Sequence, residues 1–148
     1  EELRALGAAA VYLDDEAGLA PAKKDLHGSE IRLAANSVSG DSAIRLMDLL
    51  SPGGTLVTYG AMSRRSLKVP NKFLIFKDLV LRGLWITRWL EHAGTDELFK
   101  ALDPLAKMIL HGELVQPVDE IIPMSEHRRA MRRAQETGRT GKIILDLA

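Results

Sequence analysis

Two periods of hydrophobic and polar positions alternate along the first part of the chain, and each predicts a different element. Apolar runs of strand length lie at residues 9–13, 31–36 and 55–59. Between the last two runs, a Ser/Asp start precedes apolar residues at helical spacing, which predicts a helix over residues 39–50. Strands that alternate with helices over short connections are typical of a parallel sheet with crossover helices. The chain is therefore predicted to belong to the α/β class.

The rest of the chain contains further elements of both kinds. Helices are expected at 1–6, 73–77 and 125–136, with room for a short one within 14–28, and extended segments at 79–86, 115–124 and 141–147. Residues 95–110 form the longest predicted helix, with Thr95 as its N-cap and Gly112 after its end. Pro104 lies inside this helix and is expected to kink or divide it.

The run at 55–59 is followed by Gly60, and this glycine raises the first question about function. In parallel sheets ligands bind at the carboxyl ends of the strands, and residues 36–40 and 59–62 are two such ends. Glycine at a strand end indicates that something approaches the backbone closely. Gly60 either lets a flat ligand lie against the strand or forms only a tight turn, and spacing alone leaves both interpretations open.

Composition narrows the classes of function. The 148 residues are 46% hydrophobic and 27% charged, which is ordinary for a soluble globular domain. Twenty basic and twenty acidic residues cancel, so no overall field attracts nucleic acid or an anionic membrane. No apolar run reaches the roughly twenty residues of a membrane span. The chain has no cysteine and four scattered histidines, so no metal site is expected. The opening "EELRALG" reads as the end of a helix, and the chain is expected to be part of a longer protein.

Six segments together resemble one enzyme superfamily. They are "LGAAAVY", "LAANSVSG", "GGTLVTYGAM", "FLIFKDLVLRGLWITRW", "IIPMSEHRRAMRRA" and "GKIILDL". They look like the medium-chain dehydrogenase/reductase superfamily and, within it, resemble the trans-2-enoyl-CoA (enoyl thioester) reductases of the mitochondrial fatty-acid-synthesis type. "VTYGAM" followed by "IFKDLVLRGLW" is the most specific part. The resemblance covers essentially the whole chain but corresponds only to the C-terminal part of such an enzyme.

This resemblance implies a Rossmann-type doubly wound parallel sheet with strand order 3-2-1-4-5-6, of which the chain supplies strands 3 to 6 and lacks strands 1 and 2. Residues 1–112 would form part of the dinucleotide-binding domain, and residues 113–148 a C-terminal segment of the substrate and catalytic domain. Strands 1 and 2 would lie between residues 9–13 and 31–36, which leaves a gap of about 14 Å that no hydrogen bond crosses. The chain is thus expected to be a truncated reductase or a remnant that packs differently.

The resemblance also implies contacts with NADP(H). The nicotinamide half would lie along four residues that match the family's Tyr-Gly-Gly-Met stretch, namely Tyr59, Gly60, Ala61 and Met62. The backbone of a second stretch would meet the carboxamide, namely Leu84, Trp85 and Ile86. Lys142 matches a lysine that reaches the cofactor, and residues 36–40 match a turn beside it. If Gly60 lies beside the nicotinamide, its replacement by Val should weaken cofactor binding more than stability.

Several functional parts of the family have no match in the chain. These are the glycine-rich loop for the pyrophosphate, the basic motif for the 2′-phosphate and the N-terminal half with the proton-donating tyrosine. Tyr12 and Tyr59 are the only tyrosines, and neither lies in that context. No catalytic residue is therefore assigned, and the isolated chain is expected not to reduce enoyl thioesters.

The parent enzyme is expected to be an NADPH-dependent enoyl thioester reductase of fatty acid synthesis, with a substrate carried by CoA or acyl carrier protein. The resemblance implies a homodimer paired through the edge strand from Leu79 to Ile86. Such an enzyme would lie in the cytoplasm of a bacterium or the mitochondrial matrix of a eukaryote. A quinone oxidoreductase, a zinc-independent member similar to alcohol dehydrogenases and a non-catalytic dimerising module remain as alternatives. No nucleic-acid or membrane partner is expected.

Two basic clusters allow more than one interpretation. Four arginines gather in the predicted C-terminal helix: Arg128, Arg129, Arg132 and Arg133. Zero net charge favours a solvated helix face over nucleic-acid binding, with Ala130, Met131 and Ala134 as a plausible buried stripe. Four further cations follow Met62: Arg64, Arg65, Lys68 and Lys72. They could meet the phosphates of CoA or an acidic carrier protein, although an ordinary solvated loop is the more common case. Lys77 allows a catalytic interpretation but is more often a surface residue in such a context.

Overall fold

The computed structural model describes residues 2–136 and 138–147, and the chain divides into two compact units, Glu1–Glu91 and His92–Ala148. Each unit is described by itself. The predicted assignment of residues 1–112 to a cofactor domain and of 113–148 to a substrate domain stays a prediction, because compact packing alone does not assign a ligand to either part. Among the described residues, no helix combines the length and the apolar composition needed to cross a membrane.

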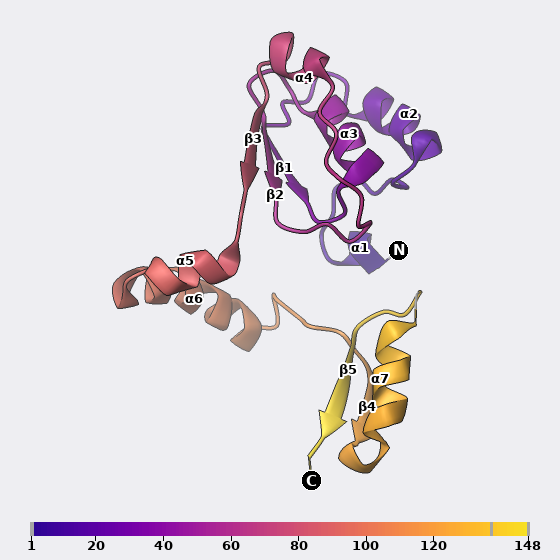
Figure 1. Cartoon of the computed structure of the whole chain (residues 1–148), viewed down its shortest axis with the longest axis vertical. Coiled ribbons are helices and arrows are strands. Elements are labelled where there is room, and N and C mark those ends of the chain that lie inside the picture. Colours follow the sequence, from indigo (N-terminus) through magenta and orange to yellow (C-terminus); the bar gives the residue numbers. More distant parts are fainter. Residues whose placement is uncertain (1, 137, 148) are drawn as a thin grey trace. The chain divides into compact units, whose positions relative to one another are not determined.

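Unit 1 contains a parallel sheet with its helices, as the hydrophobic pattern predicts (Figure 1). In chain order its elements are α1 (Glu2–Ala5), α2 (Glu16–Asp25), β1 (Leu33–Asn36), α3 (Gly40–Leu49), β2 (Thr55–Thr58), α4 (Asn71–Ile75), β3 (Val80–Gly83) and α5 (Ile86–His92), which ends at the boundary with unit 2. The strands pair in the order β1-β2-β3, and both pairs are parallel. The α/β class and the parallel sheet are therefore confirmed.

The apolar stripe of α3 explains why this unit packs as it does. Ala43 and Met47 lie one helical turn apart on α3 and are both fully buried. They pack with Leu56 of β2 and with Phe73 of α4, and Ala34 of β1 packs at the margin of the same cluster. Alternate residues of the strands face this core, so α3 covers one face of the sheet. This packing supports the strands whose carboxyl ends form the candidate site described below.

One predicted strand of this unit does not form. Residues 9–13 are apolar enough for a strand, but the structure assigns them no strand, and Leu13 is 73% exposed. The physical reason is that a strand needs a partner for its backbone hydrogen bonds, and no described strand is hydrogen-bonded to this segment. The apolar pattern of residues 9–13 therefore predicted a strand whose pairing partner the described residues do not supply.

The predicted strand from Leu79 to Ile86 is shorter than expected. β3 ends at Gly83, and the amide of Leu84 donates the last bond of this edge to the carbonyl of Thr58, at 2.9 Å. β2 also ends at Thr58, so the ladder has no partner for later residues. Leu84 and Trp85 consequently follow the strand, and Ile86 opens α5.

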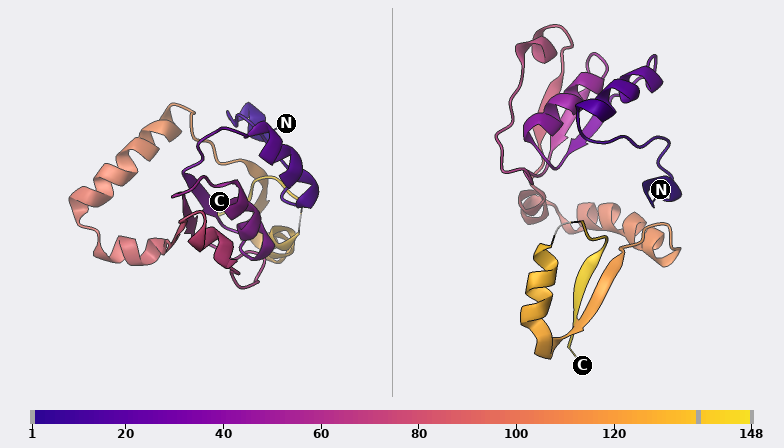
Figure 2. Two further views of the ribbon diagram at one scale, coloured as in Figure 1. Left: turned by 90° about the horizontal axis from the view of Figure 1, so that it is seen from above. Right: turned by 90° about the vertical axis from the view of Figure 1, so that its right-hand side faces the viewer.

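Unit 2 contains a long helix and a small parallel sheet (Figure 2). Its elements are α6 (Thr95–Leu110), β4 (Val118–Pro123), the 3-10 turn η1 (Met124–Glu126), α7 (His127–Gln135) and β5 (Lys142–Asp146). β4 and β5 pair in parallel, with a register shift between Val118 and Glu120. The helix predicted over 95–110 is confirmed, but its N-cap is Gly94 and not Thr95, and the helix continues through Pro104 without being divided.

The buried stripe predicted for α7 is only partly present. Ala130 is buried, whereas Met131 is 62% exposed and Ala134 is also exposed. The described sheet beneath α7 has two strands, which are too narrow to bury the whole apolar stripe of the helix. Of the three residues predicted for this stripe, the sheet buries Ala130.

Candidate functional site

The carboxyl ends of β1, β2 and β3 lie at the same edge of the sheet. The register pairs Asn36 with Thr58 and Thr58 with Gly83, so the three strands end level with one another. The segments that follow them are residues 36–40, 59–62 and 84–86. Sequence reasoning selected each of these segments, and the structure brings them to one edge. This is the edge at which parallel sheets bind their ligands.

The turn after β1 is built around a buried asparagine. The side chain of Asn36 accepts a hydrogen bond from the amide of Ser39 at 2.9 Å and donates one to the hydroxyl of Thr58 at 3.1 Å. Asn36 therefore ties the turn to β2 and satisfies its own polar atoms without solvent. Ser39 has φ 70° and ψ −165°, a conformation that non-glycine residues rarely adopt. The hydrogen bond that its amide donates to Asn36 helps to hold this strained residue in place.

The segment after β2 lies directly on that turn. The amides of Tyr59, Met62 and Ser63 donate hydrogen bonds to the carbonyls of residues 36, 37 and 38, each at 3.0 Å. A Cβ atom added to Gly60 would lie 2.8 Å from the carbonyl oxygen of Ser37. The backbone that approaches Gly60 closely is thus the protein's own, and Gly60 does not have the positive φ of a turn glycine. The glycine is required by contact between two strand-end segments, which neither of the two sequence-based interpretations included.

Five large side chains at this edge expose apolar surface: Tyr59, Met62, Leu84, Trp85 and Ile86. Exposure reaches 55% for Tyr59, 67% for Trp85 and 78% for Met62. These side chains follow two adjacent strands, β2 and β3. An apolar surface with polar backbone groups can receive one face of a planar heteroaromatic ring and bind its polar substituents. The predicted contacts of Tyr59–Met62 and of residues 84–86 with a cofactor stay predictions.

Lys142 belongs to the other unit. It opens β5, its side chain is exposed, and its amide donates to the carbonyl of Pro117 at 2.8 Å. Its contact with a cofactor also stays a prediction.

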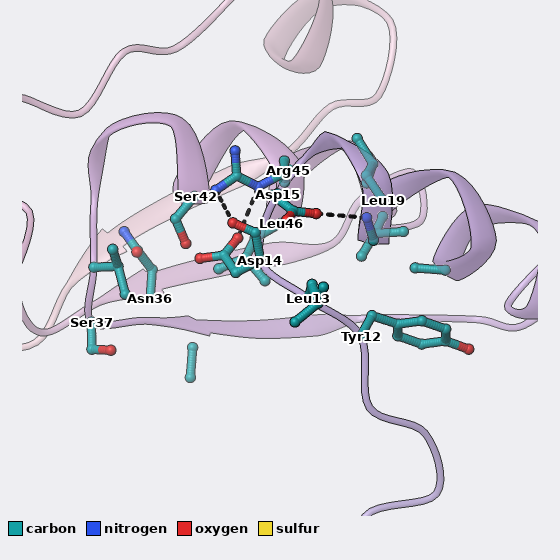
Figure 3. A pocket seen from close by; sticks show the side chains of 15 residues that line it. Tyr12, Leu13, Asp14, Asp15, Leu19, Asn36, Ser37, Ser42, Arg45 and Leu46 are labelled. Atoms are coloured by element: carbon teal, nitrogen blue, oxygen red, sulfur yellow. Dashed lines mark hydrogen bonds and ion pairs between the residues drawn. The ribbon is translucent and has the colours of Figure 1, made fainter. Parts of the chain in front are cut away.

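A cavity of about 290 Å³ borders the open edge of β1, beside residues 12–15, α2 and α3 (Figure 3). Its charged side chains already have partners within the protein. Arg45 donates from Nε to Oδ1 of Asp14 at 2.8 Å and also to the Asp14 carbonyl, and Asp15 accepts the amide of Gly18 at the start of α2. Burial alone would raise the pKa of Asp14, but hydrogen bonds from Arg45 and Ser42 outweigh it and hold the pKa below its usual value. This cavity offers space but little free chemistry.

The two tyrosines differ in their surroundings. Tyr59 lies at the strand-end edge, whereas the hydroxyl of Tyr12 donates to Asp25 at 3.2 Å. Desolvation and this hydrogen bond raise the pKa of Tyr12. A tyrosine whose proton is shared with a carboxylate in this way is a poor donor to a substrate.

Lys77 has a structural role that the sequence pattern did not reveal. Its ammonium group donates to the carbonyls of Met47, Asp48 and Leu50 at 2.6 to 3.1 Å, where α3 ends. A cation at this position satisfies carbonyls that the last turn of a helix leaves without partners. Desolvation lowers the pKa of Lys77 below its usual value. The catalytic interpretation of Lys77 therefore has no support in its contacts.

No group of three or more His, Asp or Glu side chains able to hold a metal ion occurs within residues 2–136 and 138–147. The candidate site is thus an apolar edge lined with backbone groups.

Residues 6–145 match the family described as zinc-binding dehydrogenase. Among curated relatives, the mitochondrial enoyl-[acyl-carrier-protein] reductase of Rattus norvegicus is 33% identical over 99% of this chain and 40% of its own length. The enzyme of the same name from Xenopus tropicalis is 38% identical over 98% of this chain and 43% of its own length. The chain therefore spans about two fifths of the length of these relatives.

Solved structures of the same fold match the chain at lower identity. A mutant enoyl thioester reductase from Candida tropicalis matches 99% of this chain and 42% of its own, with a TM-score of 0.78 and 22% identity. An Etr1p complex with NADP and crotonyl-CoA matches 90% of this chain and 38% of its own, with a TM-score of 0.73 and 21% identity. A quinone reductase from Bacillus thuringiensis matches 88% and 40%, with a TM-score of 0.75 and 15% identity. At such identities the likeness shows the Rossmann-type fold alone.

Proposed function

Because the chain belongs to the zinc-binding dehydrogenase family, we propose that it forms the nicotinamide side of an NADPH-dependent 2-enoyl thioester reductase. The observation that carries this proposal is the 33% identity to a mitochondrial enoyl-[acyl-carrier-protein] reductase over 99% of the chain. Fold likeness alone would not choose this function, because a quinone reductase has a comparable TM-score. Identity along the sequence therefore supports the enoyl thioester reductase over the quinone reductase.

The residues at the strand-end edge fit the nicotinamide half of NADPH. Tyr59 and Met62 after β2, and Trp85 after β3, expose apolar surface beside backbone groups at the edge where parallel sheets bind ligands. When bound, the nicotinamide supplies a hydride for the carbon–carbon double bond of the thioester. The contribution of this chain is to position the ring through Tyr59–Met62 and Leu84–Ile86, and to exclude water from one of its faces.

Two parts of the reaction are left to residues that the chain does not contain. No glycine-rich loop for the pyrophosphate occurs in the sequence. Neither tyrosine suits the protonation of the substrate α-carbon. The hydroxyl of Tyr12 is hydrogen-bonded to Asp25, and Tyr59 follows β2 in the segment that we assign to the nicotinamide. We therefore expect the 148-residue chain alone to be inactive with enoyl thioesters.

A homodimer is part of this proposal. β3 is an edge strand of the sheet in unit 1, with one side unpaired among the described residues. Pairing with the same strand of a second copy would satisfy its free backbone groups. The relatives are described as mitochondrial, and a matrix location in a eukaryote or a cytoplasmic one in a bacterium follows only if this chain shares their role.

The experiment compares two substrates with one cofactor. The complete protein encoded by the gene, and the 148-residue chain, are each assayed for NADPH oxidation with crotonyl-CoA and with a quinone. We expect the complete protein to reduce crotonyl-CoA at least about tenfold faster, since matched contacts worth about 1.4 kcal/mol change a rate by that factor. A clear preference for the quinone would move the protein to the alternative activity. Turnover of crotonyl-CoA by the 148-residue chain would contradict our assignment of pyrophosphate binding and substrate protonation to residues outside this chain.

A further inference from the structure

The segment after the strand-end edge, residues 63–69, is a basic loop held in place at both ends. At its start, the amide of Ser63 donates to the carbonyl of Val38 at 3.0 Å. Toward its end, Leu67 and Val69 are half-buried and pack against the core of unit 1. The basic loop is therefore anchored, and its outward side chains start from a fixed backbone. Such preorganisation lowers the conformational entropy that a ligand must remove on binding.

The anchoring directs the cations of the basic loop outward. Arg64, Arg65 and Lys68 are exposed, while the inward residues 67 and 69 flank Lys68. Arg65 forms an ion pair with Asp41 at 3.1 Å. Within residues 2–136 and 138–147, neither Arg64 nor Lys68 has an ion pair or a side-chain hydrogen bond. Among the described residues, Arg65 is thus the one exposed cation of this loop that is paired with a carboxylate, and Arg64 and Lys68 keep their charges unpaired.

A cavity of about 340 Å³ lies between the basic loop and the first turn of α3. It is lined by Gly40, Asp41, Arg65, Ser66 and Lys68. Gly40 has φ 57°, and a Cβ atom there would lie 3.1 Å from the Cβ of Arg65. Glycine at this position lets the loop lie directly on the helix, which keeps Arg65 beside the cavity.

Lys72 does not belong to this group of cations. It lies over the ring of Phe73, 4.7 Å from its centre, and its nearest carboxylate is Asp48 at 3.8 Å. It lines a different cavity. Of the four cations that the sequence places together, Arg65 and Lys68 line the cavity beside α3, Arg64 lies on the same loop, and Lys72 lines another cavity.

We propose that the basic loop binds the phosphate groups of the coenzyme A portion of a CoA thioester. This inference rests on the proposed function, and it selects CoA over acyl carrier protein as the carrier. CoA carries a diphosphate and a 3′-phosphate, so several cations on a fixed loop match its charge. A cavity of this size receives part of a small ligand, whereas an acidic protein would need a wider basic surface than three side chains. The basic loop also follows Met62 directly, which places it next to the proposed nicotinamide edge.

Calorimetric titration of the 148-residue chain tests this proposal without any turnover. The probes are CoA, adenosine 3′,5′-bisphosphate, pantetheine, NADPH and an acidic acyl carrier protein. The test variant is Arg64→Gln/Lys68→Gln, which removes the two cations that have no internal partner. The control variant is Lys24→Gln/Arg32→Gln, which removes the same charge from exposed positions elsewhere in unit 1. Circular dichroism verifies that both variants are folded.

We expect the test variant to bind CoA and adenosine 3′,5′-bisphosphate about tenfold more weakly, and the control variant to bind them as the unchanged chain does. Binding of both probes should also weaken as salt is raised. If both variants lost affinity for the two probes equally, the loss would be explained by net charge alone, and the proposal would be overturned. A loss confined to NADPH would assign the loop to the cofactor, and binding of an acidic carrier protein without CoA would assign it to that partner; either result overturns the proposal. CoA binding at the loop without enoyl reduction by the complete protein would remove the proposed function and keep the phosphate site.

Discussion

In unit 1 two helices and three strands enclose an apolar core, whereas in unit 2 a helix lies on two strands with little buried apolar surface and several ion pairs. The core of unit 1 consists of Ala43, Met47, Leu50, Leu56, Phe73 and Leu79, all buried. Among the described residues of unit 2, only Ile122 and Ala130 are buried hydrophobic side chains. Since burial of apolar surface is the main source of stability, unit 1 has the stronger internal framework.

Charged contacts take the place of a core between α7 and β4 of unit 2. Arg129 contacts Glu120 at 2.6 Å, and Arg133 contacts Asp119 at 2.9 Å. Both arginines also pair with glutamates nearby in sequence. These side chains are used inside the unit, so the arginines of α7 form a structural cluster, and the nucleic-acid interpretation loses two of its four cations.

The difference explains where a ligand site can be held accurately. The three strand ends of unit 1 stand on the buried core, and buried Asn36 fixes the first of them. A binding edge needs such support, because its backbone groups must keep their positions without the ligand. In unit 2, α6 contributes no buried residue, and side chains such as Phe99 and Ile109 stay exposed. The contrast predicts that equal substitutions in the two units have unequal effects.

The largest expected effect comes from replacing the same residue type in each unit. Phe73 of α4 is 1% exposed, whereas Phe99 of α6 is 60% exposed. Phe73→Ala should lower the free energy of unfolding by about 3–5 kcal/mol, because it removes buried surface and leaves a cavity. Phe99→Ala should change it by about 0.5 kcal/mol or less. Urea unfolding followed by circular dichroism compares the two variants.

Phe76 supplies a control inside unit 1. It lies three residues after Phe73 but is 82% exposed, so Phe76→Ala should resemble Phe99→Ala. Comparable losses for Phe73→Ala and Phe99→Ala would mean that α6 is buried against a partner in solution. The difference in buried apolar surface between the two units would then hold only for the chain without its partner.

A smaller effect is expected at the strand-end edge itself. Gly60→Ala places a Cβ atom 2.8 Å from the carbonyl oxygen of Ser37, so the two segments must move apart, at a cost of about 1–3 kcal/mol. Gly83→Ala is the matched control, because its Cβ would have no neighbour within 4 Å and its φ is not positive. Melting curves of both variants give the loss in stability.

The same pair of variants separates packing from cofactor contact. The structure predicts that Gly60→Ala lowers the melting temperature more than Gly83→Ala does. NADPH titration of the same variants, corrected for the folded fraction, measures any loss of cofactor affinity apart from the loss of stability. Weakened NADPH binding with an unchanged melting temperature would restore the earlier expectation that Gly60 mainly faces a ligand.

The sequence predicted the elements of the two units better than their contacts. The helix over 95–110 is confirmed, because its apolar spacing is a local property. The run at 9–13 has an equally local pattern and forms no strand, because pairing depends on a neighbour elsewhere in the chain. Local pattern therefore identified where apolar residues lie, and pairing decided which of them became strands.

The candidate site shows the same limit. Residues 36–40 and 59–62 were placed at strand ends from the alternation of elements, whereas residues 84–86 were selected by the family resemblance and were expected inside a strand. The level ends of β1, β2 and β3 bring the three segments to one edge. The contact of Gly60 with Ser37 depends on strand register, and the three bonds of Lys77 depend on where α3 ends. Both are tertiary relations that no spacing within one segment encodes. Lys72 and the other three cations are likewise separated only by the fold.

The smallest effect concerns the ion pairs of unit 2. Arg133→Gln removes the contacts of α7 with Asp119 and Glu120, whereas Arg128→Gln removes an arginine on the same helix for which the structure gives no ion pair. Because exposed pairs stabilise weakly, amide exchange in β4 should accelerate only about two- to fivefold in Arg133→Gln at low salt. At 1 M salt the Debye length falls to about 3 Å, so the difference from Arg128→Gln should disappear. Amides of β2 in unit 1 should exchange alike in both variants, since an apolar core does not depend on these charges. A difference in β4 that persists at 1 M salt would show that packing of the arginine stem, and not charge, attaches α7 to its sheet.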